Sequence, residues 1–476
     1  MYKNYINGEW VEAPEGRENI NPSDITDVVG VYAHGDALQA KQAIAAAKSA
    51  FPAWSASTPQ QRFDVLDFVG TEILARKQEL GRLLAREEGK VLPEAIGEVT
   101  RAGHIFKFFA GEALRQAGEH IKSVRQGIDI DVFRQPIGVV GLITPWNFPI
   151  AIPAWKSAPG LAFGNTVVLK PAELAPGCSW AIAEIISRSG LPKGVFNLVN
   201  GPGSKIGEAL VTHPDVAGIS FTGSQEVGGR IAQHCAKQLK KHQLEMGGKN
   251  PLVVLDDADL DVAVNAAING AFYSTGQRCT ASSRLIVTEG FHDRFVSRMV
   301  ERMAKLKVDD ALVEGTDIGP AVDEAQLEKD LSYVDLGKRE GGKISFGGEW
   351  LKRSKEGFYI APTLITETTN KMRINQEEVF GPVAGVIRVK NYDEALAVAN
   401  DTPYGLSAGI CTTSLKYATH FKEHSQAGMV MVNLPTAGVD YHVPFGGRKG
   451  SSFGSREQGK YAVEFYTTVK TCYVSS

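Results

Sequence analysis

A single cysteine stands in a polar stretch of the sequence. Cys279 lies in the segment STGQRCTAS, directly after Arg278 and before Thr280. A thiol that only fills a hydrophobic core, the common fate of cysteine, usually has apolar neighbours. A cation beside a thiol in polar surroundings instead favours the thiolate, which is the reactive form. Cys279 is therefore a candidate nucleophile, with a buried structural thiol as the alternative.

A glutamate with apolar neighbours is a candidate general base. Glu245 lies in HQLEMGGKNP, between Leu244 and Met246, and two glycines follow. Apolar flanks predict partial burial, which raises the pKa of a carboxyl group. Such a group suits proton removal from a thiol or a water. The alternative is a solvated surface charge.

An asparagine within an aromatic segment is a candidate oxyanion donor. Asn147 lies between Trp146 and Phe148 in ITPWNFPIAIPAWK, directly after the predicted strand GVVGL. The carboxyl ends of parallel strands are where α/β sheets bind ligands. A side-chain amide placed there can donate a hydrogen bond to a developing oxyanion. The alternative is an asparagine that only serves a proline-rich turn.

Three segments are candidates for holding a dinucleotide. The segment FTGSQEVGG, with Gly223 and Ser224, indicates a strand, a turn and a helix N-terminus that can bind a pyrophosphate. The segment NGPGSKIG contains Gly203, but its glycine spacing departs from G-x-G-x-x-G and is a weak fingerprint. Lys170 and Glu173, in LKPAEL, can together bind ribose hydroxyls.

The order of the predicted elements indicates an α/β fold. Three helical segments are expected near the N-terminus, at about 36–54, from Pro59 onward with Thr58 as N-cap, and at about 93–116. From residue 138, short β-branched runs alternate with helical stretches, which predicts parallel sheets in two successive blocks. Two further segments alternate like antiparallel strands, HIKSVRQGIDIDVFRQ and YTTVKTCYV.

Composition excludes several classes of protein. A net charge of -3 offers no basic field for nucleic acid or an anionic membrane surface. No apolar run approaches the ~20 residues that span a bilayer. The N-terminal segment lacks the pattern of a signal or transit peptide, so a cytoplasmic location is expected. The five scattered cysteines form no disulfide framework, which is consistent with a reducing compartment.

No metal site is predicted. His420 and His424, in THFKEH, have the spacing of two zinc ligands on a helix. The residue after His420 is a phenylalanine rather than a glutamate, and no third ligand is indicated. A solvated helix face is the interpretation for this pair.

Seven motifs together resemble the aldehyde dehydrogenase superfamily over essentially the whole chain. They are PWNFP, LKPAE, FTGS-x-x-VG, LEMGGKNP, GQRC, EEVFGPV and PFGGRK, in the family's order and approximate spacing. The resemblance implies a Rossmann-like cofactor domain (1–117 and 137–247), a catalytic α/β domain (248–450) and an oligomerisation arm (118–136 and 451–476). It also implies a homo-oligomer, dimer or tetramer.

The resemblance assigns roles residue by residue. It implies that Cys279 is the nucleophile, Glu245 the general base, and Asn147 an oxyanion donor with the Cys279 backbone N–H. The candidate residues for holding NAD or NADP are Trp146, Lys170, Glu173, Gly203, Gly223, Ser224, Met246, Glu378 and Phe380. The candidates for contacting substrate are Phe148, Trp155 and Arg278.

The implied reaction is oxidation of a small-molecule aldehyde to a carboxylate. Thiolate attack gives a thiohemiacetal alkoxide, which loses hydride to nicotinamide, and water then cleaves the thioester. A cysteine hydrolase would need a histidine base, and none of the motifs contains one. A CoA-acylating relative, which often lacks the hydrolytic glutamate, and an inactive structural homologue are further alternatives.

Within the family, the sequence most resembles the bacterial 2-oxoglutarate-semialdehyde (2,5-dioxopentanoate) dehydrogenases. The segments GVDYHVPFGGRKGSSFGSREQG and GQRCTASSR carry this resemblance. Other semialdehydes, such as succinate semialdehyde, and aromatic or betaine aldehydes are the alternatives. Glu173 favours NAD because a carboxylate repels a 2′-phosphate, whereas Lys170 can offset that repulsion.

Arg278 has two interpretations. Its guanidinium could bind the far carboxylate of a semialdehyde bidentately and favour the Cys279 thiolate. Alternatively, it points away from the site and pairs with a surface carboxylate.

Overall fold

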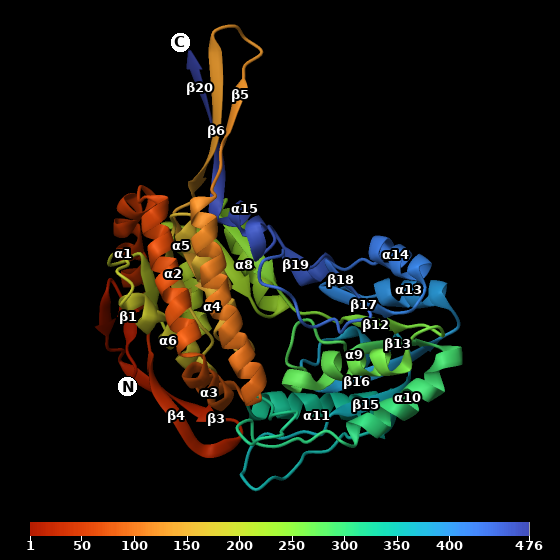
Figure 1. Cartoon of the computed structure of the whole chain (residues 1–476). Coiled ribbons are helices and arrows are strands. Elements are labelled where there is room, and N and C mark those ends of the chain that lie inside the picture. The colour runs from red at the N-terminus through yellow and green to blue at the C-terminus, as the bar shows by residue number, and fades with distance from the viewer. Residues whose placement is uncertain (476) are drawn as a thin grey trace.

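Two α/β bodies lie side by side, and a long strand arm projects from one of them (Figure 1). The computed structural model describes residues 1–475. Residue 476, the last residue of the predicted arm, lies outside the described residues. The predicted α/β class is confirmed, since the elements form a larger sheet in each body.

The first body is built on an eight-stranded sheet whose central strands are parallel. The order is β19-β11-β10-β7-β8-β9-β1-β2, and β7, β8, β9, β10 and β11 run in the same direction. Strands that are buried on both faces have nearly continuous apolar sequences, and TVVLK in β8 is an example. The bounds are β1 Asn4–Ile6, β2 Glu9–Val11, β7 Val139–Ile143, β8 Thr166–Lys170, β9 Phe196–Leu198, β10 Val216–Thr222, β11 Lys241–Glu245 and β19 Ser452–Phe453.

Helices cover both faces of this sheet, and a hairpin precedes them. The hairpin joins β3 (Glu15–Asn21) and β4 (Asp24–His34). The capping box predicted at Thr58 is present at the start of α2. The helices are α1 Ala37–Ser55, α2 Pro59–Ala75, α3 Lys77–Glu88, α4 Leu92–Leu114, α5 Ala151–Ala162, α6 Pro176–Ser187, α7 Glu208–Thr212 and α8 Gln225–Lys237.

The prediction of three helices in the N-terminal region was wrong, because α3 is a fourth. It starts two residues after α2 ends and has no side-chain cap at its N-terminus, so no start signal marks it. Its C-cap, Gly89, adopts a left-handed conformation (φ 89°), the usual glycine stop.

The second body contains a seven-stranded sheet, parallel except at β14. Its order is β14-β15-β16-β13-β12-β17-β18. The strands are β12 Pro251–Val254, β13 Arg284–Thr288, β14 Lys343–Phe346, β15 Thr363–Thr368, β16 Val383–Val389, β17 Ser407–Cys411 and β18 Met429–Val432. The helices are α9 Leu260–Phe272, α10 Glu289–Met303, α11 Glu324–Arg339, α12 Arg373–Gln376, α13 Tyr392–Asn400 and α14 Leu415–His424.

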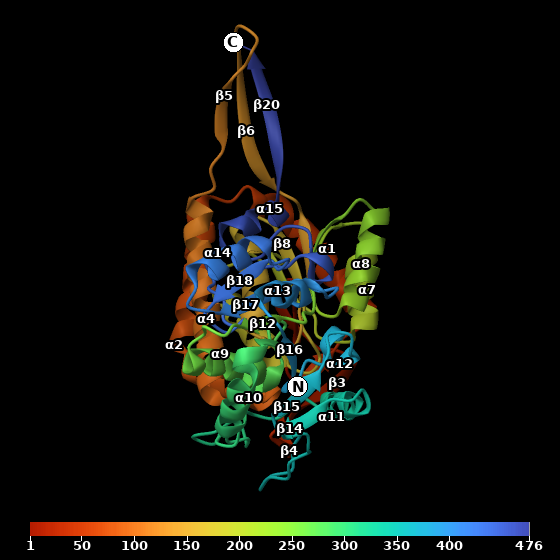
Figure 2. The ribbon, with the colours of Figure 1, turned by 90° about the vertical axis from the view of Figure 1, so that its right-hand side faces the viewer.

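The arm is a three-stranded antiparallel sheet that stands away from both bodies (Figure 2). It consists of β5 (Glu119–Lys122), β6 (Ile128–Pro136) and β20 (Thr467–Ser475). Both segments that alternate like antiparallel strands in the sequence therefore meet in one sheet. Pairing between β6 and β20 runs from Pro136 opposite Thr467 to Ile128 opposite Ser475.

The stretch 451–466 does not belong to the arm, although the sequence interpretation placed it there. β19 pairs with β11 at the edge of the first sheet. Phe465 and Tyr466, in the short helix α15 (Val463–Tyr466), are buried in the core of the first body. Burial of these two aromatic side chains stabilises the packing of this segment against the first body, because exposure of the rings to water is unfavourable.

No helix in residues 1–475 is long and apolar enough to cross a bilayer. Within the same residues, no three His, Cys, Asp or Glu side chains are grouped to hold a metal ion. His420 and His424 lie on α14, where Nδ1 of His420 is 2.7 Å from the Tyr392 hydroxyl and Nδ1 of His424 is 2.9 Å from the His420 backbone oxygen.

Candidate active site

One edge of the first sheet gathers most of the predicted site. Asn147 follows β7, Lys170 ends β8, Gly223 follows β10 and Glu245 ends β11. The strands are parallel, so their carboxyl ends meet at the same edge. Four motifs that are spread over residues 147–245 are thereby brought together.

The loop that carries Cys279 faces this edge from the second body. It follows α9 and a 3₁₀ turn in which Ser274, Thr275 and Gly276 all have positive φ (51°, 57° and 64°). A side chain at Gly276 would collide with the backbone oxygen of Gly381. Glycine is required there on both counts. The left-handed turn reverses the chain after α9 and presents Cys279 toward the first body.

Asn147 contacts the cysteine loop directly. Its Nδ2 donates a hydrogen bond of 3.0 Å to the backbone oxygen of Gln277, two residues before Cys279. Its own backbone oxygen accepts a 2.8 Å hydrogen bond from the Lys90 Nζ. With 3% of its surface exposed, Asn147 is fixed on both sides. A buried amide held in this way can donate its second N–H to an oxygen beside Cys279.

The surroundings of Cys279 favour the protonated thiol. Burial, followed by the nearby carboxylates of Glu378 and Glu245, raises its pKa to about 12, whereas hydrogen bonds from the Cys279 and Thr280 backbone N–H act in the opposite direction. Arg278, which the sequence predicted to favour the thiolate, forms an ion pair with Glu94. Activation of the thiol therefore requires a base.

Glu245 is the residue that the sequence predicts as that base. It is 2% exposed, and burial together with the neighbouring Glu457 raises its pKa well above the usual range. Its Oε2 accepts a 2.6 Å hydrogen bond from Oγ of Ser452, whereas Oε1 has no partner within residues 1–475. The predicted rise in pKa is confirmed, and the free oxygen can accept a proton.

A second carboxylate lies against the glycines that follow Glu245. Glu378, which precedes β16, accepts a 2.8 Å hydrogen bond from the backbone N–H of Gly248. A side chain at Gly247 would overlap the same carboxylate. Phe380 meets Trp146 edge-on, with ring centroids 5.4 Å apart. The sequence motifs around Glu378 and Glu245 therefore meet in space.

The Lys170 and Glu173 cluster includes an arginine that the sequence interpretation did not find. Arg17, in β3, forms an ion pair with Glu173. Lys170 donates to the backbone oxygen of Pro171 at 2.8 Å, and burial lowers its pKa to about 8. The carboxylate expected to repel a 2′-phosphate is thus partly neutralised.

The remaining cofactor candidates surround the ends of β10 and β11. The backbone N–H of Gly223 donates to the Glu245 backbone oxygen at 3.0 Å, and Ser224 caps α8 through Val227. Met246 is buried. Gly203, at the start of a short π-helical turn (Gly203–Gly207), has open space where a side chain would be.

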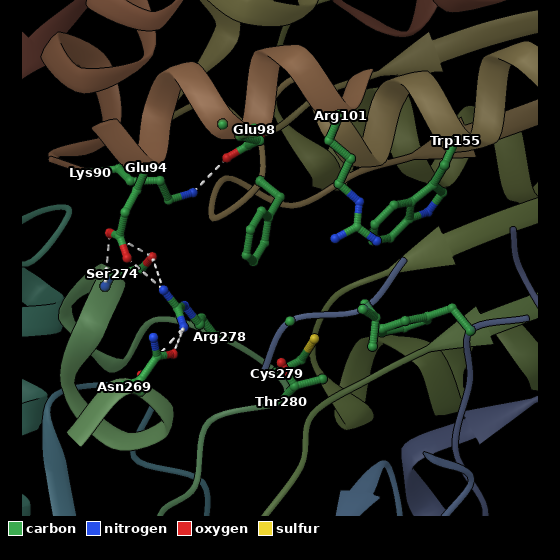
Figure 3. Close-up of a pocket in the computed structure, with 15 residues that line it drawn as sticks. Lys90, Glu94, Glu98, Arg101, Trp155, Asn269, Ser274, Arg278, Cys279 and Thr280 are labelled. Carbon is green, nitrogen blue, oxygen red and sulfur yellow. Dashed lines mark hydrogen bonds and ion pairs between the residues drawn. The ribbon is translucent and has the colours of Figure 1, made fainter. Parts of the chain in front are cut away.

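A cavity of about 320 Å³ lies in front of Cys279 (Figure 3). All three substrate candidates, Phe148, Trp155 and Arg278, line it. Arg278 lines the cavity and also forms an ion pair, because its Nη2 lies 2.7 Å from Oε1 of Glu94. Glu94 lines the same cavity. The structure therefore combines parts of both interpretations of Arg278.

Sequence reasoning missed one wall of this cavity, which α4 supplies. Glu94, Glu98 and Arg101 project from one face of that helix at spacings of four and three residues, and Gly97 lies between them. That spacing places the three side chains on one face of the helix, and it is the sequence feature from which this wall could have been predicted. The sequence analysis placed a helix at about 93–116 and assigned no role to its charged residues.

Comparison with known proteins agrees with this geometry. The sequence profile described as "Aldehyde dehydrogenase family" matches residues 10–472. The chain belongs to the aldehyde dehydrogenase family. Among curated relatives of this dehydrogenase, an alpha-ketoglutaric semialdehyde dehydrogenase of Bacillus subtilis is 44% identical, covering 99% of this chain and 98% of the relative. A 2,5-dioxopentanoate dehydrogenase of Saccharolobus solfataricus is 40% identical, covering 98% of each.

Solved structures of aldehyde dehydrogenases share the fold. Betaine aldehyde dehydrogenase from Staphylococcus aureus, in complex with NAD+, superposes with a TM-score of 0.97 at 35% identity, covering 100% of this chain and 95% of that chain. The predicted aldehyde dehydrogenase fold is thereby confirmed. The two semialdehyde relatives are more similar in sequence than this structural neighbour, which bears on the choice of substrate.

Proposed function

We propose that this aldehyde dehydrogenase oxidises 2-oxoglutarate semialdehyde (2,5-dioxopentanoate) to 2-oxoglutarate with NAD or NADP. The observation that carries the reaction is that Asn147 and Glu245, from the first body, lie near Cys279, which lines the cavity from the second body. The semialdehyde relatives, similar over their whole length, support the substrate. A cavity near the small end of the usual range, about 300–1,000 Å³, fits a compact aldehyde.

The residues along the sheet edge fit a dinucleotide. Lys170 and Glu173 offer a donor and an acceptor for ribose hydroxyls, and Gly223 with Ser224 opens the N-terminus of α8 for a pyrophosphate. Glu378 and Phe380 offer a second ribose acceptor and a ring contact. Further candidates are Trp146, Gly203 and Met246. Bound NAD or NADP supplies a hydride acceptor, which no side chain here can provide.

The first chemical task of the protein is to activate Cys279 and hold an oxyanion. Because its pKa is raised, the thiol must lose its proton as it attacks, and Glu245 is the proposed acceptor. The sulfur bonds to the aldehyde carbon, and the carbonyl oxygen takes the negative charge. Nδ2 of Asn147 and the Cys279 backbone N–H donate to that oxygen, and one such donor typically contributes about 100- to 1000-fold in rate.

The second task is to release the product. After oxidation, the carbon is held to Cys279 as a thioester. Once Glu245 has released the Cys279 proton to solvent, it takes a proton from a water, the resulting hydroxide adds to the thioester carbon, and the sulfur leaves as the thiolate. A buried carboxylate with a raised pKa is the stronger base for this purpose. Retention of this glutamate favours hydrolysis over transfer of the acyl group to CoA.

We also propose the domain division and assembly implied by the sequence. The first sheet belongs to a cofactor domain (1–117 and 137–247) and the second to a catalytic domain (248–450). The arm exposes Val469, Tyr473 and Val474 on β20 and leaves strand edges at β5 and β20. Exposed apolar strands with open edges are typical of surfaces that pair between copies, which supports a homo-oligomer. A cytoplasmic location is proposed from the five unpaired cysteines.

The function is tested by a substrate comparison without CoA. Reduced cofactor is measured with 2-oxoglutarate semialdehyde, succinate semialdehyde, betaine aldehyde and an aromatic aldehyde. We expect the highest kcat/KM for 2-oxoglutarate semialdehyde, with 2-oxoglutarate as the product. A higher kcat/KM for another aldehyde would overturn the substrate, and a strict requirement for CoA would overturn the hydrolytic reaction.

A further inference from the structure

The charges around the cavity leave one cation without an anion. Three cationic side chains line it, Lys90, Arg101 and Arg278, together with two carboxylates, Glu94 and Glu98. Lys90 Nζ lies 2.6 Å from Oε2 of Glu98, and Arg278 pairs with Glu94 at 2.7 Å. Within residues 1–475, Arg101 has no ion pair, and the carboxylates of Glu98 and Asp440, which act to raise its pKa, do not outweigh the lowering of that pKa by burial.

Arg101 is held in place by contacts that do not use up its donors. Its Nη2 donates to Oε1 of Gln458 at 3.0 Å, and its guanidinium lies 5.6 Å from the ring centroid of Trp155. Its Nε is buried and has no partner within the described chain. Buried donors are nearly always satisfied, so an unsatisfied one beside a cavity calls for an explanation.

Two residues that contact Arg101 carry further buried donors without partners. Trp155 Nε1 and Gln458 Nε2 are also buried and lack hydrogen-bond partners within residues 1–475. Figure 3 shows Arg101 extending from α4 into the space above the loop that carries Cys279. A bound group that supplies acceptors and negative charge would satisfy this end of the cavity.

We propose that Arg101 is the specificity-determining residue, and that it binds the carboxylate at the far end of the substrate while the aldehyde carbon meets Cys279. This inference rests on the proposed function. A 2-oxo acid presents a carboxylate oxygen and a neighbouring keto oxygen as two acceptors, which suits the planar donor fork of a guanidinium. The chemical class selected is therefore a short aldehyde with a terminal carboxylate.

Arg101 is better suited to this role than Arg278. The charge of Arg278 is already neutralised by Glu94, and Oγ of Ser274 accepts a further 2.8 Å hydrogen bond from the same Nη2. Arg101 can bind an anion without breaking an ion pair. An unpaired guanidinium also repels a quaternary ammonium group, so the same residue disfavours betaine aldehyde.

A buried cation without a partner should cost stability in the free enzyme. Desolvation of a charge is unfavourable unless an opposite charge compensates it. Residues kept for function often carry such a cost. Replacing Arg101 by an apolar side chain of similar length should therefore leave the thermal unfolding midpoint at or above that of the unmodified protein, provided that no substrate is bound.

The test compares Arg101→Met with Arg278→Met on three aldehydes: 2-oxoglutarate semialdehyde, an uncharged aldehyde of the same chain length, and betaine aldehyde. For Arg101→Met we expect kcat/KM to fall about 10- to 150-fold for the acidic substrate, as for loss of a charge-assisted hydrogen bond. The value for the uncharged aldehyde should change less than about threefold, and that for betaine aldehyde should rise. Arg101→Lys should recover part of the loss, since it restores charge without the fork.

The inhibition constant of 2-oxoglutarate, measured against the uncharged aldehyde, should rise in Arg101→Met and provides a readout without turnover of the acid. Equal losses on all aldehydes together with a lower unfolding midpoint would make Arg101 structural and overturn the inference. A loss selective for the acid in Arg278→Met, and absent in Arg101→Met, would assign the role to Arg278 instead. If the unmodified enzyme does not oxidise the acidic semialdehyde, the proposed function itself fails.

Discussion

The Oγ of Ser452 donates a 2.6 Å hydrogen bond to Oε2 of Glu245, from a position 207 residues further along the chain. The contact exists because β19 returns to the first sheet and places Ser452 opposite Glu245 in the β11 ladder. This hydrogen bond lowers the pKa of Glu245, against the larger effects of burial and of Glu457. Ser452 therefore lowers the pH above which Glu245 can act as the proposed base.

Ser452→Ala should move the acid limb of the kcat–pH profile to higher pH. Removing a donor to a carboxylate raises its pKa, so Glu245 would lose its proton only at a higher pH. A hydrogen bond to a charged group, worth about 1.5–3 kcal/mol, corresponds to a shift of about 1–2 pH units. The measurement is kcat against pH with a saturating aldehyde.

Ser452→Thr is the matched control, since it retains the hydroxyl group and should keep the acid limb near its original position. The thermal midpoint is recorded for both variants, because Oγ also accepts a 2.6 Å hydrogen bond from the Gly447 N–H. A limb in Ser452→Ala that stays in place or moves to lower pH would contradict the role of Ser452.

Glu245→Gln should slow thioester hydrolysis more than the steps before it. The amide cannot take a proton from water, so the acyl group would accumulate on Cys279. Stopped-flow absorbance is expected to show a burst of reduced cofactor close to one equivalent per site, formed more slowly than in the unmodified enzyme because Glu245 is also the proposed base for the thiol, and then a much slower steady rate. An unchanged steady rate would remove Glu245 from the mechanism.

Arg17→Ala should shift cofactor preference toward NAD. The ion pair with Glu173 neutralises the carboxylate that would repel a 2′-phosphate. Both side chains are partly exposed, so we expect a modest effect of about two- to fivefold in the ratio of kcat/KM for NAD to that for NADP. Arg17→Lys, which keeps the charge, should change the ratio less. A shift toward NADP in Arg17→Ala would contradict this assignment.

The arm should mediate assembly. Val469 and Tyr473 are 55% and 61% exposed on β20, and charges at these positions would have to be buried if the strand pairs with another copy. We expect light scattering to give a dimer or tetramer of the 51.4 kDa chain, and Val469→Asp with Tyr473→Asp to shift it toward the monomer. Leu38→Asp, at an exposed residue on α1, is the control. A monomeric unmodified protein at micromolar concentration would reject the proposal.

Much of the site could be predicted because short motifs carry it. Cys279, Glu245 and Asn147 each lie at or near the end of a strand or helix whose period is visible in the sequence, and topology then brings them together. Most strands of the parallel sheets were predicted for the same reason, since each is short, β-branched and bounded by turns, but β15 was not identified.

The residues that sequence reasoning missed act through contacts across long separations. Arg17 meets Glu173 at a separation of 156 residues, and Arg101 meets Gln458 at one of 357. The sequence does not show whether a charged residue on a helix faces water or a cavity. The residues that enclose a cavity come from other parts of the chain. The sequence analysis of Arg278 also lacked its partner, because Glu94, which forms the ion pair with Arg278, lies 184 residues earlier in the chain.

The central claim is that oxidation proceeds through a covalent bond to Cys279. The most direct test is the formation of reduced cofactor from 2-oxoglutarate semialdehyde by Cys279→Ser. A hydroxyl is a far weaker nucleophile than a thiolate, so less than a few per cent of the rate should remain, while cofactor binding followed by fluorescence is retained. Oxidation at a substantial fraction of the original rate would contradict the account.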